Sequence, residues 1–243
     1  MKAVAKKVVE DALEDKYVTK AIGSSGTPLY FNAAITSNSE VYPLLPEIAQ
    51  GVNSNQRVGD KIRPKKLRVD FVITANGSYN SSQLNQVRLF ILQDKSIRNT
   101  NALKDIALVQ TGTPIGNLID YGGTVGAFTG VPDVIMRRVN RQRYHVFKDK
   151  TLELCAGIGQ TPQASNTYLG TQVFVSGQQC YKLSFVIPTP ALLIYSAAGD
   201  VWPSNFAPFM CLGYVQPDGN AAPDSILTRV AVNWISHLDY EDA

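Results

Sequence analysis

The stretch Lys66-Leu67-Arg68-Val69-Asp70-Phe71-Val72-Ile73-Thr74 alternates apolar and polar side chains. In an extended chain successive side chains point to opposite faces, so Leu67, Val69, Phe71 and Ile73 share one face. Lys66, Arg68 and Asp70 share the other. This arrangement is typical of a strand that packs one face on a core and exposes the other face to water. The stretch therefore predicts a half-buried β-strand.

Six further segments have the character of strands. Residues 87–92 are more continuously apolar, as expected of a central strand in a sandwich. The other five segments are 143–155, 171–187, 191–196, 209–215 and 226–238. Turn signals such as Asn76-Gly77 separate them, and a long insertion from Lys95 to Pro132 interrupts their spacing. The set predicts an all-β domain, an eight-stranded antiparallel jelly-roll sandwich with long inter-strand loops.

The beginning of the chain follows a different pattern. Between Lys2 and Val18, apolar residues recur at the three- and four-residue spacing of one helical stripe. Residues 23–26, Gly-Ser-Ser-Gly, then have the composition of a flexible linker. We therefore expect residues 1–22 to form an N-terminal amphipathic basic α-helix and residues 23–243 to form the sandwich domain. Because an isolated helix of this length is marginal in water, its apolar stripe needs a partner.

The composition narrows the classes of function. Three widely spaced cysteines suit neither a disulfide framework nor a structural zinc site. No apolar run approaches the roughly 20 residues of a membrane span, and no apolar signal core is present, so we expect no membrane partner. The two histidines belong to no catalytic motif, and the glycine-rich residues 122–126 lack the lysine of a phosphate-binding loop. We expect no enzymatic activity, no catalytic residue and no cofactor.

Basic residues are concentrated in two short segments. The formal net charge of the 243-residue chain is only +3, yet residues 57–68 and residues 137–150 each hold six basic residues against one acid. If both segments face the same side, they form an electrostatic footprint for a polyanion. Alternatively, they are solvated strand edges, where lysine and arginine discourage aggregation. Charge alone does not choose between these two interpretations.

Four motifs along the chain resemble parts of one protein family. They are Lys2-Ala3-Val4-Ala5-Lys6-Lys7-Val8-Val9; Gln50-Gly51 with Asn55-Gln56-Arg57-Val58-Gly59-Asp60; Arg141 to Leu152; and the closing Tyr240-Glu241-Asp242-Ala243. In this order they are similar to an N-terminal basic helix, a QG…NQRxGD motif, a KRFxILKDxTL strand and an acidic chain end. The family comprises the capsid protein of satellite tobacco necrosis virus and the related single-jelly-roll capsids of circular, Rep-encoding single-stranded DNA viruses.

The resemblance implies a structural capsid protein that assembles with copies of itself into an icosahedral T=1 shell of about sixty subunits. The shell encloses a single-stranded genome, RNA or DNA, bound without sequence preference, in a virion that assembles inside the host cell. Lys2, Lys6 and Lys7 match basic positions of the family helix and are expected to face the genome. The further nucleic-acid-binding candidates are Lys65, Lys66, Arg68, Arg137, Arg138, Arg141 and Arg143.

Two further interpretations stay open. Calcium bridges subunits in many small plant-virus shells; here Glu14 and Asp242 match acidic positions of the family pattern, whereas Val52 replaces an acid. A lectin-like, carbohydrate-binding jelly roll would instead stack sugars on loop aromatics such as Tyr79, Tyr121 or Trp202. Size separates the last interpretation from the capsid, because a lectin forms a monomer or small oligomer and a capsid protein forms megadalton particles.

Overall fold

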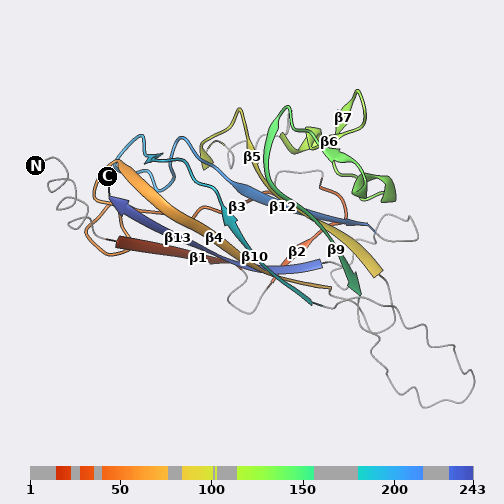
Figure 1. Ribbon diagram of the computed structural model, residues 1–243, viewed down its shortest axis with the longest axis horizontal. Helices are drawn as coiled ribbons and strands as arrows, with labels where there is room; N and C mark the ends of the chain where they lie inside the picture. The colour runs from red at the N-terminus through yellow and green to blue at the C-terminus, as the bar shows by residue number, and fades with distance from the viewer. Residues whose placement is uncertain are drawn as a thin grey trace, which may run out of the picture.

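A computed structural model of the chain describes residues 15–22, 28–35, 40–75, 84–100, 102, 114–155, 180–215 and 230–242. Its strands form two antiparallel sheets that stack as a sandwich, with a small third sheet beside them (Figure 1). The all-β class predicted from the sequence is confirmed. In the described part of the chain, no helix is long and apolar enough to cross a bilayer.

The larger sheet is built on two long central strands, β4 (Lys61–Ala75) and β13 (Val230–Asp242), which pair antiparallel. Strand β1 (Asp15–Ile22) flanks β13 and strand β10 (Cys180–Ile187) flanks β4, which gives the order β1-β13-β4-β10. Two short strands complete this six-stranded sheet: β2 (Leu29–Phe31) pairs with β13, and β11 (Leu193–Ile194) pairs with β4.

The second sheet has four strands in the order β3-β12-β5-β9, and all its pairs are antiparallel. They are β3 (Tyr42–Pro43), β12 (Phe209–Val215), β5 (Leu84–Asp94) and β9 (Tyr144–Cys155). This sheet supplies the upper layer of the sandwich in Figure 1, and the six-stranded sheet supplies the lower layer.

The first hydrophobic core lies between the two sheets. The predicted alternation in β4 is confirmed, because the side chains of Leu67, Val69, Phe71 and Ile73 are all buried there. They meet side chains of the four-stranded sheet, among them Val87, Leu89, Ile91, Met210, Leu212 and Tyr214. Apolar surface removed from water in this way supplies the main favourable term in folding.

A second core covers the opposite face of the four-stranded sheet. The part of the chain called here the insertion comprises residues 114–143 and overlaps the insertion predicted at residues 95–132. It contains the short 3₁₀ helices Pro114–Asn117 and Pro132–Ile135 and a three-stranded sheet of order β7-β6-β8. These short strands are β6 (Ile119–Asp120), β7 (Val125–Gly126) and β8 (Arg138–Val139). Phe128 of the insertion packs edge-on against Phe90 of β5, with ring centroids 5.9 Å apart. The second core also includes Phe209, Cys211 and Val215 of β12, so this strand is buried on both faces.

Gly213 of β12 shows how closely the insertion approaches the sheet. A Cβ atom at this position would lie 2.6 Å from the Phe128 ring and 2.9 Å from the Ala33 carbonyl oxygen. A glycine inside a strand is otherwise unfavourable, and it often marks such a close approach. Gly213 is thus the point at which the insertion docks.

The predicted strand boundaries differ from the observed ones in several places. Segments 66–74, 87–92, 143–155 and 209–215 correspond to β4, β5, β9 and β12. The segment predicted at 226–238 continues to residue 242, because pairing with β4 extends to Ile62. In segment 191–196 only two residues pair with β4. Residues 171–179 and 226–229 lie outside the described residues.

The predicted N-terminal helix is wrong at its end. Residues 1–14 and the expected linker at 23–26 lie outside the described residues, but Asp15–Ile22 form strand β1. Lys16 and Lys20 face the same side of β1 as Val18, and only 3% of Lys16 is exposed. These two inward lysines conceal the period-two pattern from a reading of apolar residues alone. Eight residue pairs with β13 then fix the segment as a strand.

Candidate functional site

Among the described residues, the basic side chains predicted to bind nucleic acid do not gather on one face. Lys2, Lys6 and Lys7 lie outside the described residues. The candidates of the first basic segment lie on β4, in the six-stranded sheet. The candidates of the second segment lie in the insertion, which packs on the four-stranded sheet on the far side of the sandwich (Figure 1). The structure therefore does not bring the two segments together.

Lys65 and Lys66 are neighbours on β4, and both are exposed. The register shifts between Asp239 and Tyr240 of β13, which lie opposite Lys66 and Pro64, so Lys65 is the extra residue of a β-bulge. Lys65 Nζ pairs with Asp15 and, at 2.6 Å, with Glu241. The hydrogen bond to Asp15, and to a smaller extent the one to Glu241, raises the pKa of Lys65. Lys65 is therefore engaged within the chain.

Arg68 is also engaged on the outer face of the six-stranded sheet. Its Nε donates to Asp70 Oδ1 at 3.0 Å and to Ser184 Oγ at 3.2 Å. Desolvation acts to raise the pKa of Asp70, but hydrogen bonds from Ser184 and Arg68, together with the electrostatic effect of Arg68 and His237, hold the pKa below its usual value. His237 Nε2 lies 3.9 Å from Asp70 Oδ2. Among the described residues, only Lys66 of the three β4 candidates has no such partner.

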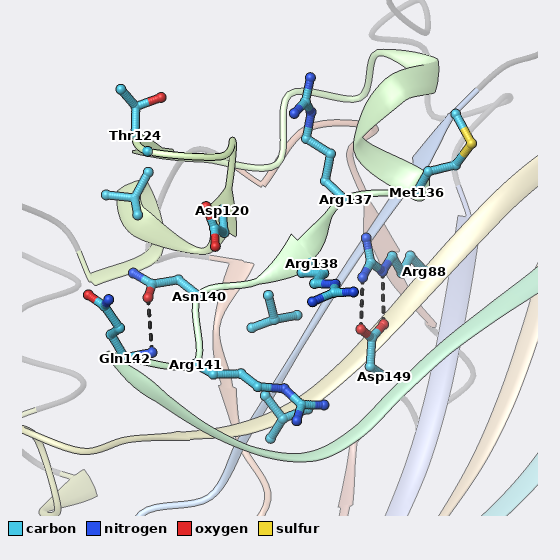
Figure 2. Close-up of a pocket in the computed structure, with 14 residues that line it drawn as sticks. Arg88, Asp120, Thr124, Met136, Arg137, Arg138, Asn140, Arg141, Gln142 and Asp149 are labelled. Carbon is cyan, nitrogen blue, oxygen red and sulfur yellow. Dashed lines mark hydrogen bonds and ion pairs between the residues drawn. The ribbon is translucent and has the colours of Figure 1, made fainter.

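An open cleft of about 650 Å³ lies between the insertion and the outer face of the four-stranded sheet (Figure 2). Its volume falls within the range of roughly 300–1,000 Å³ that is usual for ligand-binding clefts. Four arginines and two aspartates are its charged lining residues: Arg88, Arg137, Arg138, Arg141, Asp120 and Asp149. The cleft thus gathers three of the predicted basic residues and one that the sequence analysis missed.

Arg88 and Asp149 form the fixed floor of the cleft. Arg88 Nε and Nη2 donate to the two carboxylate oxygens of Asp149 at 2.8 and 2.7 Å, as Figure 2 shows. Arg88 Nη1 donates to the Val134 carbonyl oxygen at 2.7 Å, which ties the insertion to β5. Bidentate pairs of this kind are strong and geometrically specific. Every guanidinium nitrogen of Arg88 is engaged, so its role here is structural.

The arginines of the insertion differ in what holds them. Arg137 Nε donates to Asp133 Oδ2 at 2.9 Å, and its guanidinium group lies 4.8 Å from the centroid of the Tyr121 ring. Arg138 on β8 and Arg141 in the turn before β9 are exposed. Within the described ranges, neither side chain has an ion pair or hydrogen bond. These two arginines present unoccupied donors to the cleft.

Arg143 is not among the residues that line the cleft. Its Nε donates to Asp94 Oδ2 at 2.9 Å, and the Asp94 side chain is completely buried. Asp94 also accepts hydrogen bonds from the backbone and hydroxyl group of Ser96. The predicted nucleic-acid role of Arg143 thus competes with a structural one, because its guanidinium group compensates a buried charge.

Arg88 and the turn between β6 and β7, which forms one wall of the cleft, were not predicted from the sequence as parts of a site. Arg88 stands inside an apolar strand, and a charged residue in such a run is the signal that could have marked it. The wall is the β6–β7 turn, where Gly122 and Gly123 have φ values of 80° and 118°. Gly122 N–H donates to Asp120 Oδ1 at 2.8 Å. The glycine-rich stretch thus lies beside the arginines, which no sequence spacing indicated.

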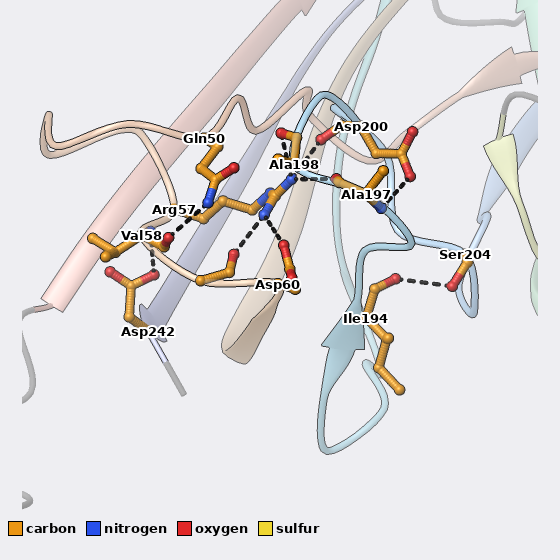
Figure 3. Close-up of polar contacts among 11 residues, drawn as sticks. Gln50, Arg57, Val58, Asp60, Ile194, Ala197, Ala198, Asp200, Ser204 and Asp242 are labelled. Atoms are coloured by element: carbon orange, nitrogen blue, oxygen red, sulfur yellow. Dashed lines mark hydrogen bonds and ion pairs between the residues drawn. The ribbon is translucent and has the colours of Figure 1, made fainter.

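Arg57, from the second motif of the resemblance, is completely buried and joins two loops, one before β4 and one after β11 (Figure 3). Its guanidinium group donates to Gly59 O, to Asp60 Oδ1 at 3.2 Å, and to three carbonyl oxygens of the 197–200 loop at 2.9–3.1 Å. It also lies 4.1 Å from the Tyr195 ring centroid. This arrangement, called here the Arg57 clasp, is structural and contributes nothing to a basic surface.

The calcium-ligand candidates are placed as follows. Asp242 Oδ1 accepts from the Val58 backbone N–H at 3.1 Å, and its Oδ2 pairs with Lys16 at 2.7 Å. Glu14 lies outside the described residues, and Val52 is exposed. Among the described residues, no group of three or more acidic, histidine or cysteine side chains is arranged to hold a metal ion. Asp242 thus already has partners within the chain.

Of the three aromatic residues of the lectin alternative, the two described ones, Trp202 and Tyr121, are not arranged to stack on sugars. Trp202 is buried in the first core, and Lys20 Nζ lies 4.7 Å from its ring centroid. Tyr121 donates its hydroxyl hydrogen to Ala127 O at 2.9 Å, and Arg137 covers its ring. Tyr79 lies outside the described residues.

Comparisons with models of known protein families and with curated proteins found no match to this chain.

Proposed function

We propose that this chain is a jelly-roll capsid protein, which assembles with copies of itself into a small icosahedral shell around a single-stranded genome. The pairing of its eight principal strands carries the proposal. In order along the chain these strands are β1, β3, β4, β5, β9, β10, β12 and β13. The first pairs with the last, the second with the seventh, the third with the sixth and the fourth with the fifth.

This nested pairing is what results when one long antiparallel hairpin rolls up into two packed sheets. Jelly rolls are eight-stranded sandwiches of this kind, and viral capsid domains are among the proteins that use them. Lectins and cupins use them as well, so the fold alone does not decide the function. The resemblance to capsid proteins favours a shell, and the positions of Trp202 and Tyr121 disfavour the lectin.

The exposed surface suits a protein with several neighbours. Val52, Val58 and Met136 are large apolar residues with more than half of their surface in water. They lie on two separate loops, one beside the Arg57 clasp and one in the insertion. Specific contacts between subunits bury on the order of 1,200–2,000 Å² each, and loops on a rigid sandwich supply such area without disturbing its core. No catalytic role is needed for this function.

Negative-stain electron microscopy of the purified chain tests the proposal. We expect uniform closed shells, and absorbance at 260 and 280 nm on the same sample reports whether they contain nucleic acid. Salt and calcium are varied in parallel, because subunit contacts between charged groups are screened by salt. A chain that stays monomeric or forms only small oligomers in all these conditions contradicts the proposal.

A further inference from the structure

We infer that the cleft between the insertion and the four-stranded sheet binds the sugar-phosphate backbone of single-stranded nucleic acid, with Arg138 and Arg141 as the phosphate ligands. The inference deepens the proposed function, on which it rests for the identity of the polyanion. It narrows the ten predicted basic residues to two, and it assigns the glycine-rich turn of residues 122–126 to the same site.

The first step concerns which donors are available. Arg88 has its three nitrogens on Asp149 and on Val134 O, and Arg137 is held by Asp133. Arg138 and Arg141 are exposed at the cleft and, in the described part of the chain, their guanidinium groups have no acceptor. A guanidinium group presents a rigid fork of donors that matches two phosphate oxygens.

The second step concerns the rigidity of these two positions. Arg138 lies on β8, where its backbone is opposite that of Asp120 in the antiparallel pairing of β6 with β8. The backbone carbonyl of Arg141 accepts from Lys95 Nζ at 2.6 Å. Asn140 Nδ2 donates to Asn117 O at 3.1 Å, and Asn140 Oδ1 accepts from the backbone of the turn. These contacts fix the backbone that carries the two arginines, so binding orders only their side chains and less conformational entropy is lost.

The third step concerns which part of the nucleic acid is recognised. No aromatic side chain is among the residues that line the cleft. Base recognition in single strands relies on stacking against aromatic rings, so this cleft has no platform for the bases. Contacts with phosphates carry no sequence information. Binding is therefore independent of base sequence.

The fourth step separates nucleic acid from a sulfated polysaccharide. Asp120 and Asp149 lie among the arginines, and Asp120 stands beside the glycine turn (Figure 2). A nucleic-acid strand carries one charge per nucleotide and separates successive phosphates by neutral sugars. A phosphate can therefore meet the arginines while a neutral sugar lies against the carboxylates. A densely sulfated chain presents acidic groups to these carboxylates and is repelled by them.

The test measures binding of a fluorescein-labelled oligothymidylate by fluorescence anisotropy, over a series of salt concentrations. The cleft variant is Arg138→Ala with Arg141→Ala. The matched control is Lys61→Ala with Lys182→Ala, which removes the same charge from exposed positions on the six-stranded sheet that are not among the predicted nucleic-acid-binding residues. All four side chains are exposed, so neither variant is expected to unfold, and circular dichroism and thermal melting verify this.

We expect the cleft variant to bind more weakly and to lower the slope of log K against log salt by about 1.4, since each single-strand phosphate contact contributes about 0.7. The control is expected to keep the slope of the unmodified protein. Oligoadenylate and oligocytidylate are expected to give the same affinity as oligothymidylate. An equal loss in both variants, or binding to heparin in place of the oligonucleotides, overturns the inference. Electron microscopy of the same samples reports shell formation separately, so failure of the proposed function is recognised independently.

Discussion

Replacing Arg57 by alanine probes how far the Arg57 clasp stabilises the domain. The side chain is completely buried and donates to four backbone carbonyls, those of Gly59, Ala197, Ala198 and Asp200, as well as to one carboxylate. Removing it leaves these acceptors without this donor and opens a cavity next to Tyr195. The clasp joins the loop before β4 to the loop after β11, so its loss affects both.

A buried acceptor that loses its partner costs about 1–3 kcal/mol. Ala197 O still accepts from the Asp200 backbone N–H at 3.1 Å, so three carbonyls lose their donor, and at the lower end of that range they give about 3 kcal/mol. For a domain of this size the corresponding fall in melting temperature is about 6–12 °C. Arg57→Lys keeps the charge but loses the fork of donors, so we expect about half of this effect.

Urea unfolding followed by tryptophan fluorescence measures these losses, because Trp202 and Trp234 are both buried. All variants are compared at one protein concentration, since assembly stabilises the folded chain by mass action. Arg63→Ala is the control: Arg63 is mostly exposed and lies 3.6 Å from Glu241, so its loss costs about 0–1 kcal/mol. An Arg57→Ala variant that loses no more than this control refutes the reasoning.

Three further predictions concern other parts of the domain. Gly213→Ala is expected to destabilise by about 1–3 kcal/mol, because the new methyl group overlaps the Phe128 ring and the Ala33 carbonyl oxygen. Phe128→Ala in the same chain should remove the part of this cost that comes from the ring. Additive losses of the two substitutions in a thermal melt contradict the close approach. Cys180 is exposed and should react with a maleimide in the folded protein. Cys211 is buried and desolvation raises the pKa of its thiol, so it should react only on unfolding. Peptide mass spectrometry shows which of the two cysteines is labelled. The pKa of Asp70 is lowered in the folded chain, so its stabilising contribution is present above its ordinary pKa of about 3.8 and is lost as the pH falls through the folded value. The difference in urea midpoint between the native chain and Asp70→Asn should therefore shrink from pH 7 to pH 3. An equal difference at both pH values contradicts the assignment.

The sequence predicted those strands whose buried face is made of apolar side chains. β4 is the clearest case, because Leu67, Val69, Phe71 and Ile73 must all reach the core together. The continuous burial of β12 was predicted as apolar character, but its cause, a second core beneath the insertion, depends on residues more than 70 positions away in the chain, such as Phe128. The two-residue strands of the insertion are too short to show any period.

The charged residues were harder to place than the strands. Arg57 and Arg141 look alike in a charge count, yet one is completely buried and the other is exposed. Which of the two an arginine becomes depends on distant partners such as Ala197, which only the fold brings near. The same holds for Lys16, whose inward position led to a predicted helix where a strand lies. Basic clusters in the sequence therefore contain exposed arginines such as Arg138 and Arg141 together with residues that the fold holds in ion pairs.

Sedimentation of the purified chain in the analytical ultracentrifuge tests the central claim most directly. A shell of about sixty subunits, each of 26.5 kDa, has a protein mass of about 1.6 MDa. We expect a single sharp boundary at that mass or, if nucleic acid is enclosed, above it. A chain that sediments only as a monomer or small oligomer, across the same range of salt and calcium, contradicts the assignment as a capsid protein.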